Sequence, residues 1–414
     1  MSKTWCGAAI WAAAISAGMV PPLAAVAAEA VKIGVILPLT GNSASAGQSI
    51  KDALELGAEI VNAPHAELKG TPLAGASGRG AKIELDEADH QGNPELGQQQ
   101  TTRLIMADHV AAMLGAYHSS VALAATAVAE RQAVPFLVAD SVAPSITARG
   151  FKFTFRTAPV AADFGKTYAE FINAVRKSGL KLDTFAIVNE DTDYGIAAAE
   201  SILDAAKAGN INVAAHIAYN ANSPDLAPQV LQLKTANPDA VIFISYTADS
   251  ILFFKTMKSL DYLPPMVIGD DAGFSDPAFI ASAGDLAQGL LDRSVFDIGR
   301  PGANSFIVNK LFHDKYGRDL DETGARWMQG LFVLADALNR AGSTDAEKIR
   351  EALNETELKP EQLMVGYKGV KFDANGQNAL GATFLTQLKG KRYVSVWPEA
   401  LATDKLDLPM KGWR

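Results

Sequence analysis

Short apolar runs alternate along the chain with longer segments whose apolar residues recur at helical spacing. Runs rich in β-branched and other apolar residues predict buried strands. These runs cover residues 31–37, 82–87, 111–114, 134–137, 184–188, 212–217 and 240–244. Segments rich in Ala, Leu, Glu and Lys predict helices over 47–62, 95–108, 122–131, 164–178, 195–208 and 226–237. This alternation is typical of an α/β fold in which helices cover both faces of a parallel sheet.

The alternation of strands and helices restarts after Thr157, which predicts two similar α/β lobes. Length supports this reading, because the roughly 385 residues that follow the N-terminal apolar run exceed one ordinary domain. The glycine-rich stretch 65–80 predicts a surface loop.

Polar residues gather where the predicted strands end. In open parallel sheets, ligands bind outside the carboxyl ends of the strands, where helices begin. In the first lobe these ends are residues 38–47, 115–120 and 139–144, and in the second lobe they are 189–195, 245–247 and 267–271. Hydroxyl groups, backbone donors and carboxylates therefore recur on the same sheet edge of both lobes.

Each polar group also has a purely structural interpretation. Ser119 and Ser120 could cap a helix, and Asp270 and Asp271 could cap a turn. Their recurrence on both lobes favours a ligand site, since a helix N-terminus attracts a carboxylate and an acid attracts an ammonium group. The pattern predicts a receptor for a small zwitterion, with tyrosines covering its side chain.

The N-terminal segment has the order of a secretory signal. Lys3 precedes an apolar run over 8–26, and small residues follow at 24–28. We expect residues 1–28 to be a signal peptide and the protein to be exported to the periplasm. A membrane anchor is disfavoured because Gly18, Pro21 and Pro22 interrupt the run, and a lipid anchor because Cys6 precedes it.

Charge and cysteine content exclude several classes of protein. The net charge is −9 and no basic cluster is present, which argues against nucleic acid as a partner. Cys6 is the only cysteine, so we expect neither disulfides nor a cysteine metal site. No other apolar stretch reaches the ~18 residues of a membrane span.

An enzyme is the main alternative from another class. The six histidines include no pair at metal-ligand spacing, so no metal site is indicated. The chain has no Gly-x-Ser-x-Gly elbow, no Gly-x-Gly-x-x-Gly motif and no phosphate loop, so we expect no cofactor and no enzymatic activity. Asp140 and Asp271 could form a hydrolytic pair, which only their separation would decide.

The order of several motifs resembles that of the periplasmic branched-chain amino acid binding proteins of ABC transporters, the Leu/Ile/Val-binding type. The resemblance extends over nearly the whole chain after the signal segment. It is carried by residues 33–41, 115–120, 135–147, 155–157, 193–195 and 238–240.

The resemblance implies the type I periplasmic binding fold: two Rossmann-like lobes joined by three hinge crossovers, with the ligand between them. It implies a first lobe of 31–156 plus 290–368 and a second of 157–289 plus 369–414. It also implies a monomer that binds an amino acid or a related small carboxylate and delivers it to the membrane permease of an ABC transporter. A sensor built on the same lobes is the alternative.

The resemblance also assigns the binding residues. Ser119 falls where relatives bind the ligand carboxylate, and Ser141 and Val142 fall on the next strand-end loop. Asp271, with Asp270 beside it, falls where an acid meets the ammonium group. Tyr194 and Tyr246 fall on the aromatic lid and wall of the second lobe.

The chain departs from this pattern at two places. Relatives often carry Tyr or Trp where this chain has Ala46, which implies a wider pocket that Tyr117 and His118 could refill. The expected acid is Asp271 rather than a longer Glu. Both changes bring an aromatic acid or an amide into consideration beside the branched-chain amino acids.

Overall fold

The structure is a computed structural model that describes residues 1–4, 30–63, 65, 67–68, 82–270 and 272–412. Most of the expected signal peptide and of the expected loop over 65–80 lie outside these residues, as does Asp271. Among the described residues, no helix combines the length and the apolar character that crossing a membrane requires.

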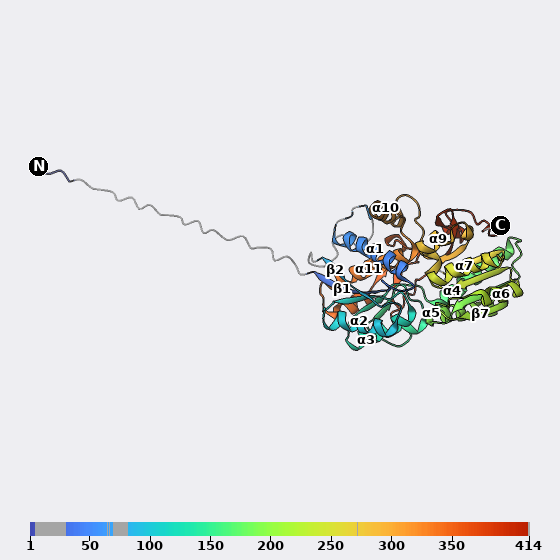
Figure 1. Ribbon diagram of the computed structural model, residues 1–414. Helices are drawn as coiled ribbons and strands as arrows, with labels where there is room; N and C mark the ends of the chain where they lie inside the picture. Colours follow the sequence, from blue (N-terminus) through green and yellow to red (C-terminus); the bar gives the residue numbers. More distant parts are fainter. Residues whose placement is uncertain (5–29, 64, 66, 69–81, 271, 413–414) are drawn as a thin grey trace.

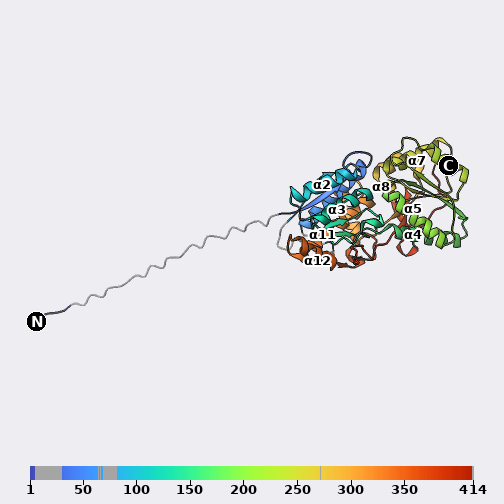
Figure 2. The ribbon, with the colours of Figure 1, turned by 90° about the horizontal axis from the view of Figure 1, so that it is seen from below.

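The chain forms two lobes side by side, each built on its own sheet (Figures 1 and 2). The first sheet has five parallel strands in the order β2-β1-β3-β4-β5. They are β1 (Val31–Leu37), β2 (Ile83–Asp89), β3 (Ala112–Gly115), β4 (Phe136–Val138) and β5 (Thr154–Arg156). The predicted strand over 31–37 is confirmed at both ends, whereas the predicted strand at 134 begins two residues later.

Helices cover both faces of the first sheet because the side chains of each strand alternate between two cores. In β1, Ile33, Val35 and Leu37 join one core cluster and Ile36 joins another. The first core is packed by α1 (Ala44–Asn62) and α11 (Glu322–Ala341), and the second by α2 (Pro94–Met106) and α3 (Ser119–Arg131). The helices α10 (Asn304–Tyr316) and α12 (Ala346–Asn354) complete the lobe.

Helix α11 is central to the first lobe, because every residue from Glu322 to Leu338 is buried. A helix that is buried all round is expected to be apolar throughout. This one nevertheless carries charged residues in its first two turns, Glu322 and Arg326, which makes those turns unusual.

The second sheet has seven strands in the order β14-β13-β10-β9-β8-β6-β7. Five run parallel: β6 (Thr184–Glu190), β7 (Asn212–Tyr219), β8 (Ala240–Ile244), β9 (Met266–Gly269) and β10 (Leu291–Ser294). The strands β13 (Phe384–Lys389) and β14 (Arg392–Trp397) pair antiparallel at one edge. Two residues join β13 to β14, so these strands form an antiparallel hairpin at the edge of the sheet, which the sequence pattern did not predict.

Six helices cover the second sheet. One face is packed by α4 (Ala161–Lys177) and α5 (Asp193–Ala208), and the other by α6 (Ala227–Ala236), α7 (Thr247–Ser259) and α9 (Pro277–Ala283). The short helix α8 (Ala272–Ser275) precedes α9. A two-stranded sheet of β11 (Glu357–Leu358) and β12 (Val370–Lys371) and the 3-10 turns η1 (Pro144–Ile146), η2 (Gly284–Ala287), η3 (Pro360–Gln362) and η4 (Glu399–Leu401) complete the described elements.

The chain crosses between the two sheets three times: after β5, after β10 and before β13. The predicted two-lobed α/β fold with three crossovers is therefore confirmed. One predicted boundary needs correction, because β10 pairs with β9 and β13 of the second sheet. Residues 290–294 thus belong with the second sheet, and the second crossover comes after Ser294.

Candidate ligand-binding site

A small cavity lies at the boundary of the two lobes, beside the strand ends named above. From the first lobe it is lined by the loops after β3 and β4 and by helix α11, and from the second lobe by the starts of α5 and α7. The lining residues are Tyr117, Ser119, Asp140, Ser141, Val142, Tyr194, Tyr246 and Arg326. Six of these eight are residues that the sequence singled out for ligand binding; Asp140 and Arg326 were not on that list.

The serines hold the first-lobe loops in place. Ser119 begins α3, and its Oγ accepts hydrogen bonds from the backbone N–H groups of Val142 (3.3 Å) and Ala143 (3.4 Å). Ser141 Oγ donates to the carbonyl oxygens of Ala116 and Tyr117. Since both bonds at Ser119 Oγ are accepted, its proton can be donated to an oxygen that reaches the N-terminus of α3.

Arg326 forms a buried ion-pair cluster with two carboxylates. Its Nη1 lies 2.5 Å from Asp140 Oδ1, its Nε lies 3.1 Å from Glu322 Oε1, and its Nη2 also bonds to Glu322. Trp327 Nε1 donates to the other Asp140 oxygen at 3.2 Å. The sequence reading missed Arg326; the available signal was Glu and Arg four residues apart in an otherwise apolar helix.

Asp270, predicted to meet an ammonium group, is instead engaged within its own lobe. Its Oδ1 lies 2.8 Å from Arg293 Nε, and neither side chain is exposed to solvent. The hydroxyl groups of Tyr168 and Tyr194 also donate to its carboxylate. The Arg293 guanidinium stacks on the ring of Phe164, 3.6 Å from its centroid.

These contacts make Asp270 a structural residue of the second lobe, and no ligand contact is needed to balance its charge. Its predicted role as a partner of the ammonium group is therefore not supported by the geometry. Burial and the charge of Asp270 raise the pKa of the Tyr168 hydroxyl well above its usual value, so this tyrosine remains a donor. Asp271, the first choice for the ammonium group, lies outside the described residues.

Aromatic rings form a continuous wall across the lobe boundary. The ring of Tyr246 in the second lobe lies 5.5 Å from that of Tyr117 and 4.7 Å from that of His118, both in the first lobe. Tyr194 lies 5.3 Å from Tyr246 on the second-lobe side. Burial, with the nearby Glu190, raises the pKa of Tyr246 well above its usual value, so this hydroxyl keeps its proton.

His118 and Ala46 lie near the site without lining the cavity. His118 faces Ser43 Oγ at 3.2 Å through Nε2, and its ring packs edge-on against that of His90. Burial and the neighbouring His90 lower the pKa of His118 well below its usual value. Ala46 is buried in the core at the start of α1, so the expected widening of the pocket at this position is not seen in the cavity lining.

Glu190 lies behind the aromatic wall, at the end of β6. Its carboxylate accepts hydrogen bonds from the backbone N–H of Thr192, from the Thr192 hydroxyl (2.8 Å) and from the backbone N–H of Gly195 (2.6 Å). It thereby caps α5, the helix that carries Tyr194. Burial raises the pKa of Glu190 to about 7, although these hydrogen bonds oppose the shift.

The lobes are closed on each other in this structure. Hydrogen bonds join Asn42 to Asn222 (2.7 Å) and Ser45 to Asp276 (2.7 Å) across the boundary. The cavity has a volume of about 20 Å³, which suffices for a water molecule but not for an amino acid. Entry of a ligand therefore requires the lobes to separate or the lining side chains to move.

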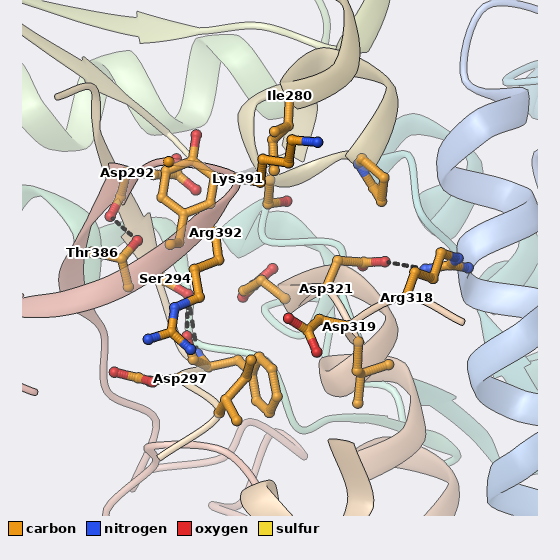
Figure 3. Close-up of a pocket in the computed structure, with 18 of the residues that line it drawn as sticks. Ile280, Asp292, Ser294, Asp297, Arg318, Asp319, Asp321, Thr386, Lys391 and Arg392 are labelled. Atoms are coloured by element: carbon orange, nitrogen blue, oxygen red, sulfur yellow. Dashed lines mark hydrogen bonds and ion pairs between the residues drawn. The ribbon is translucent and has the colours of Figure 1, made fainter. Parts of the chain in front are cut away.

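A second and larger cavity of about 710 Å³ lies at the same boundary. Figure 3 shows Asp292, Thr386 and Arg392 of the second lobe on one side of it and Arg318 and Asp321 of the first lobe on the other. Glu322 lines this larger cavity, whereas its ion-pair partner Arg326 lines the small one. In the part of the chain that the structure describes, no group of His, Cys, Asp and Glu side chains is arranged to hold a metal ion.

Comparison with known proteins identifies the family. Residues 30–392 match the periplasmic binding protein family. The chain is 30% identical to the Leu/Ile/Val-binding protein homolog 7 of Brucella abortus (strain 2308), over 97% of this chain and 98% of that protein.

Solved structures of other proteins share this two-lobed fold. A leucine-binding protein from Thermotoga maritima superposes with a TM-score of 0.74 at 24% identity, covering 88% of this chain and 97% of that one. A solute-binding protein from Rhodopseudomonas palustris BisB5, in complex with 3,4-dihydroxybenzoic acid, superposes with a TM-score of 0.74 at 21% identity, covering 92% and 98%. The family match and the relative named as a binding protein confirm the expectation of a binding protein rather than an enzyme, and the chain belongs to the periplasmic binding protein family.

Proposed function

We propose that this protein is the solute-binding component of an ABC transporter and that it captures an amino acid or a related small carboxylate between its lobes. The observation that carries the proposal is the cavity at the lobe boundary, where Ser119 and the N-terminus of α3 face Tyr194 and Tyr246 of the other lobe. A helix N-terminus with a free hydroxyl donor suits a carboxylate, and tyrosine rings suit the rest of a small ligand.

Binding would proceed in two steps. In the separated lobes, the ligand carboxylate accepts a hydrogen bond from the Ser119 hydroxyl at the N-terminus of α3. Rotation about the crossovers then brings Tyr194 and Tyr246 over the ligand. Because the ligand contacts both lobes only in the closed state, its binding energy favours closure.

Two ligand classes follow from the lining. Amino acids fit the family relationship, since the curated relative is named as a Leu/Ile/Val-binding protein homolog. An aromatic carboxylate fits the aromatic wall, and a protein of the same fold was solved with 3,4-dihydroxybenzoic acid. In both classes we propose that the carboxylate occupies the position at Ser119.

Export and partnership complete the proposal. We propose that residues 1–28 direct the chain to the periplasm and that the protein acts there as a monomer, handing its ligand to a membrane permease. Fractionation of cells that produce the full chain would test the location, since a periplasmic protein is released by osmotic shock. Retention of the protein in the cytoplasmic fraction would contradict export.

A thermal-shift screen tests the binding function. The purified protein is heated with each of the common L-amino acids, with benzoate, with 3,4-dihydroxybenzoate and with small amides. A ligand present at about 100 times its Kd should raise Tm by about 5 °C, because it binds only the folded state. Ser119→Ala should abolish most of this shift, and Ser223→Ala, on an exposed loop, should retain it. The absence of any shift across the panel would contradict the proposed ligand classes.

A further inference from the structure

Buried carboxylates at the boundary of the lobes differ in how their charge is balanced. Asp140 pairs with Arg326, and Asp270 pairs with Arg293. Glu190, the last residue of β6, is as deeply buried as Asp270. Within the part of the chain that the structure describes, however, no cation pairs with Glu190.

The partners of Glu190 are neutral donors of the loop that follows it. One oxygen accepts from the backbone N–H of Thr192 (2.5 Å), and the other accepts from the Thr192 hydroxyl (2.8 Å) and the backbone N–H of Gly195 (2.6 Å). Burial without a cation is costly for a carboxylate, and uptake of a proton removes this cost. Accordingly, burial raises the pKa of Glu190 to about 7 against these hydrogen bonds.

Closure of the lobes adds to the burial of this carboxylate. Glu190 lies behind Tyr246, where its charge adds to the effect of burial in raising the pKa of the Tyr246 hydroxyl. From the first lobe, the rings of Tyr117 and His118 pack on Tyr246, with centroids 5.5 Å and 4.7 Å away. When the lobes separate, these contacts are lost and water reaches the wall, so the ionised form of Glu190 becomes less costly.

A bound carboxylate acts on Glu190 in the same direction. In the proposed function, the ligand carboxylate lies in the small cavity, whose second-lobe wall is formed by Tyr194 and Tyr246. Glu190 is behind this wall, in surroundings where like charges repel more strongly than in water. Closure and the charge of the ligand therefore both favour the protonated form of Glu190.

Other titratable groups lie around Glu190 on both sides of the boundary. They are Asp140, Asp191, Asp193, His216, Tyr219, Tyr246 and Asp249. Burial is the main cause that raises the pKa of Tyr219 and of Tyr246 well above the usual value, so both stay neutral near pH 7. Burial also lowers the pKa of His118 well below its usual value, so closure should release protons from His118 and oppose uptake at Glu190.

We infer that Glu190 takes up a proton when the lobes close on a carboxylate ligand, and that this proton contributes to the affinity for the ligand. The inference rests on the proposed function and adds to it a coupling between ligand binding and pH. Ligand and proton then favour each other's binding, as linkage requires. Glu190 thereby acts on the ligand without touching it, since it does not line the cavity.

Calorimetry in two buffers with different heats of ionisation measures the protons taken up with each bound ligand. The ligands are L-leucine and benzoate, whose charges do not change near neutral pH, or the panel member with the largest thermal shift if neither binds. The proteins are the unmodified chain, Glu190→Gln and Glu130→Gln. Glu130 is a matched control, because its carboxylate also accepts from backbone N–H groups, those of Lys152 and Phe153, at the opposite end of α3 from the cavity.

At pH 6.5, the unmodified chain should take up about half a proton more per bound ligand than Glu190→Gln. This value corresponds to a pKa of about 7 in the closed state and about one unit lower in the separated lobes. The histidines contribute equally to both proteins, so the difference isolates Glu190. From pH 8 to pH 6, the ratio of the Kd of the unmodified chain to that of Glu190→Gln should fall about fivefold. Glu130→Gln should match the unmodified chain in both measurements.

Circular dichroism shows whether Glu190→Gln folds. If it does not, Thr192→Val takes its place, because it removes a hydrogen bond that favours the ionised carboxylate and so raises the pKa of Glu190. The pH at which proton uptake is greatest should then be higher than in the unmodified chain. An unchanged profile in folded Thr192→Val would contradict the role of Glu190.

The outcomes separate the inference from the function on which it rests. Equal proton uptake in the unmodified chain and in folded Glu190→Gln, with a Kd ratio that is independent of pH, would overturn the inference and leave the binding function intact. A difference of the same size in Glu130→Gln would also overturn it, since the effect would not be specific to Glu190. If no member of the thermal-shift panel binds the unmodified chain, the proposed function fails, and the inference fails with it.

Discussion

The ring of His118 packs against the ring of Tyr246 with their centroids 4.7 Å apart, and the two residues belong to different lobes. His118 follows β3 in the first lobe, and Tyr246 follows β8 in the second. This contact can exist only while the lobes are closed. The aromatic wall is therefore part of the closure of the protein as well as part of its cavity.

Truncating Tyr246 should weaken ligand binding by removing the wall. Its ring contacts Tyr117, His118 and Tyr194, and aromatic pairs contribute about 0.5–1.5 kcal/mol each. Tyr246→Ala should raise Kd by about tenfold or more for the tightest ligand of the thermal-shift panel, as measured by calorimetry. Tyr246→Phe keeps the ring and should change Kd little; an equal loss in both variants would assign the effect to the hydroxyl group instead.

The contacts across the lobe boundary should favour the closed state in proportion to their number. Ser45 Oγ donates to Asp276, which also accepts from the Thr247 hydroxyl. Removing one such hydrogen bond costs about 1 kcal/mol. Ser45→Ala should therefore raise Kd by about fivefold, while Ser305→Ala, whose bond to Ile298 is local, should not. Small-angle scattering would confirm the cause if the ligand-free variant is more extended than the unmodified protein.

The buried pair of Asp270 and Arg293 should matter mainly for stability. Removing one member leaves the other charge buried without its partner, which costs about 3–5 kcal/mol. Asp270→Asn should lower the unfolding free energy by about this amount in urea titrations. Asp314→Asn is the control, because its partner Lys310 and Asp314 itself are both exposed, and such pairs contribute about 0–1 kcal/mol. Near-normal stability with lost ligand binding would restore Asp270 to the role that the sequence suggested.

Much of this fold could be predicted because its pattern is local. The strand 240–244 is a continuous apolar run and the strand 31–37 is interrupted by the exposed Lys32, and both were predicted with the bounds that the structure gives. The strand-end loops were predictable for the same reason, since a parallel sheet brings the carboxyl ends of its strands to one edge. Six residues of the cavity, including Ser119 and Tyr246, follow from that rule and from the family resemblance.

The remainder of the site depends on contacts between distant parts of the chain. Arg326 lies on a helix that packs under the strand-end loop of Asp140, 186 residues earlier in the sequence. Asp270 was assigned to the ligand from the family resemblance. Its partner Arg293 lies on the neighbouring strand β10, and no local pattern reveals this pairing. In both cases only the tertiary structure shows with which charge the residue pairs.

Acid should destabilise the protein partly through the histidines behind the aromatic wall. Burial lowers the pKa of His90 from its usual 6.5 to about 3, so this ring stays neutral in the folded state while the unfolded chain takes up a proton below about pH 6.5. The unfolded state then binds more protons, and the contribution of His90 to stability is present above pH 6.5 and lost as the pH falls toward 3. The loss is at most about 1.4 kcal/mol per pH unit.

Glu190 should change the stability of the protein with pH in the opposite direction to His90, so the variants that are compared should all retain Glu190. Its pKa is raised from 4.5 to about 7, so the folded state binds the extra proton and stability rises as the pH falls through this window. Comparing variants that retain Glu190 removes its contribution.

Urea titrations between pH 4 and 7 should give His90→Asn a shallower loss of unfolding free energy toward acid than the unmodified chain, whereas His313→Asn, on an exposed helix face, should match the unmodified chain. If His90→Asn has the same slope as the unmodified chain, His90 takes up its proton without unfolding, and its burial does not resist protonation as the structure implies.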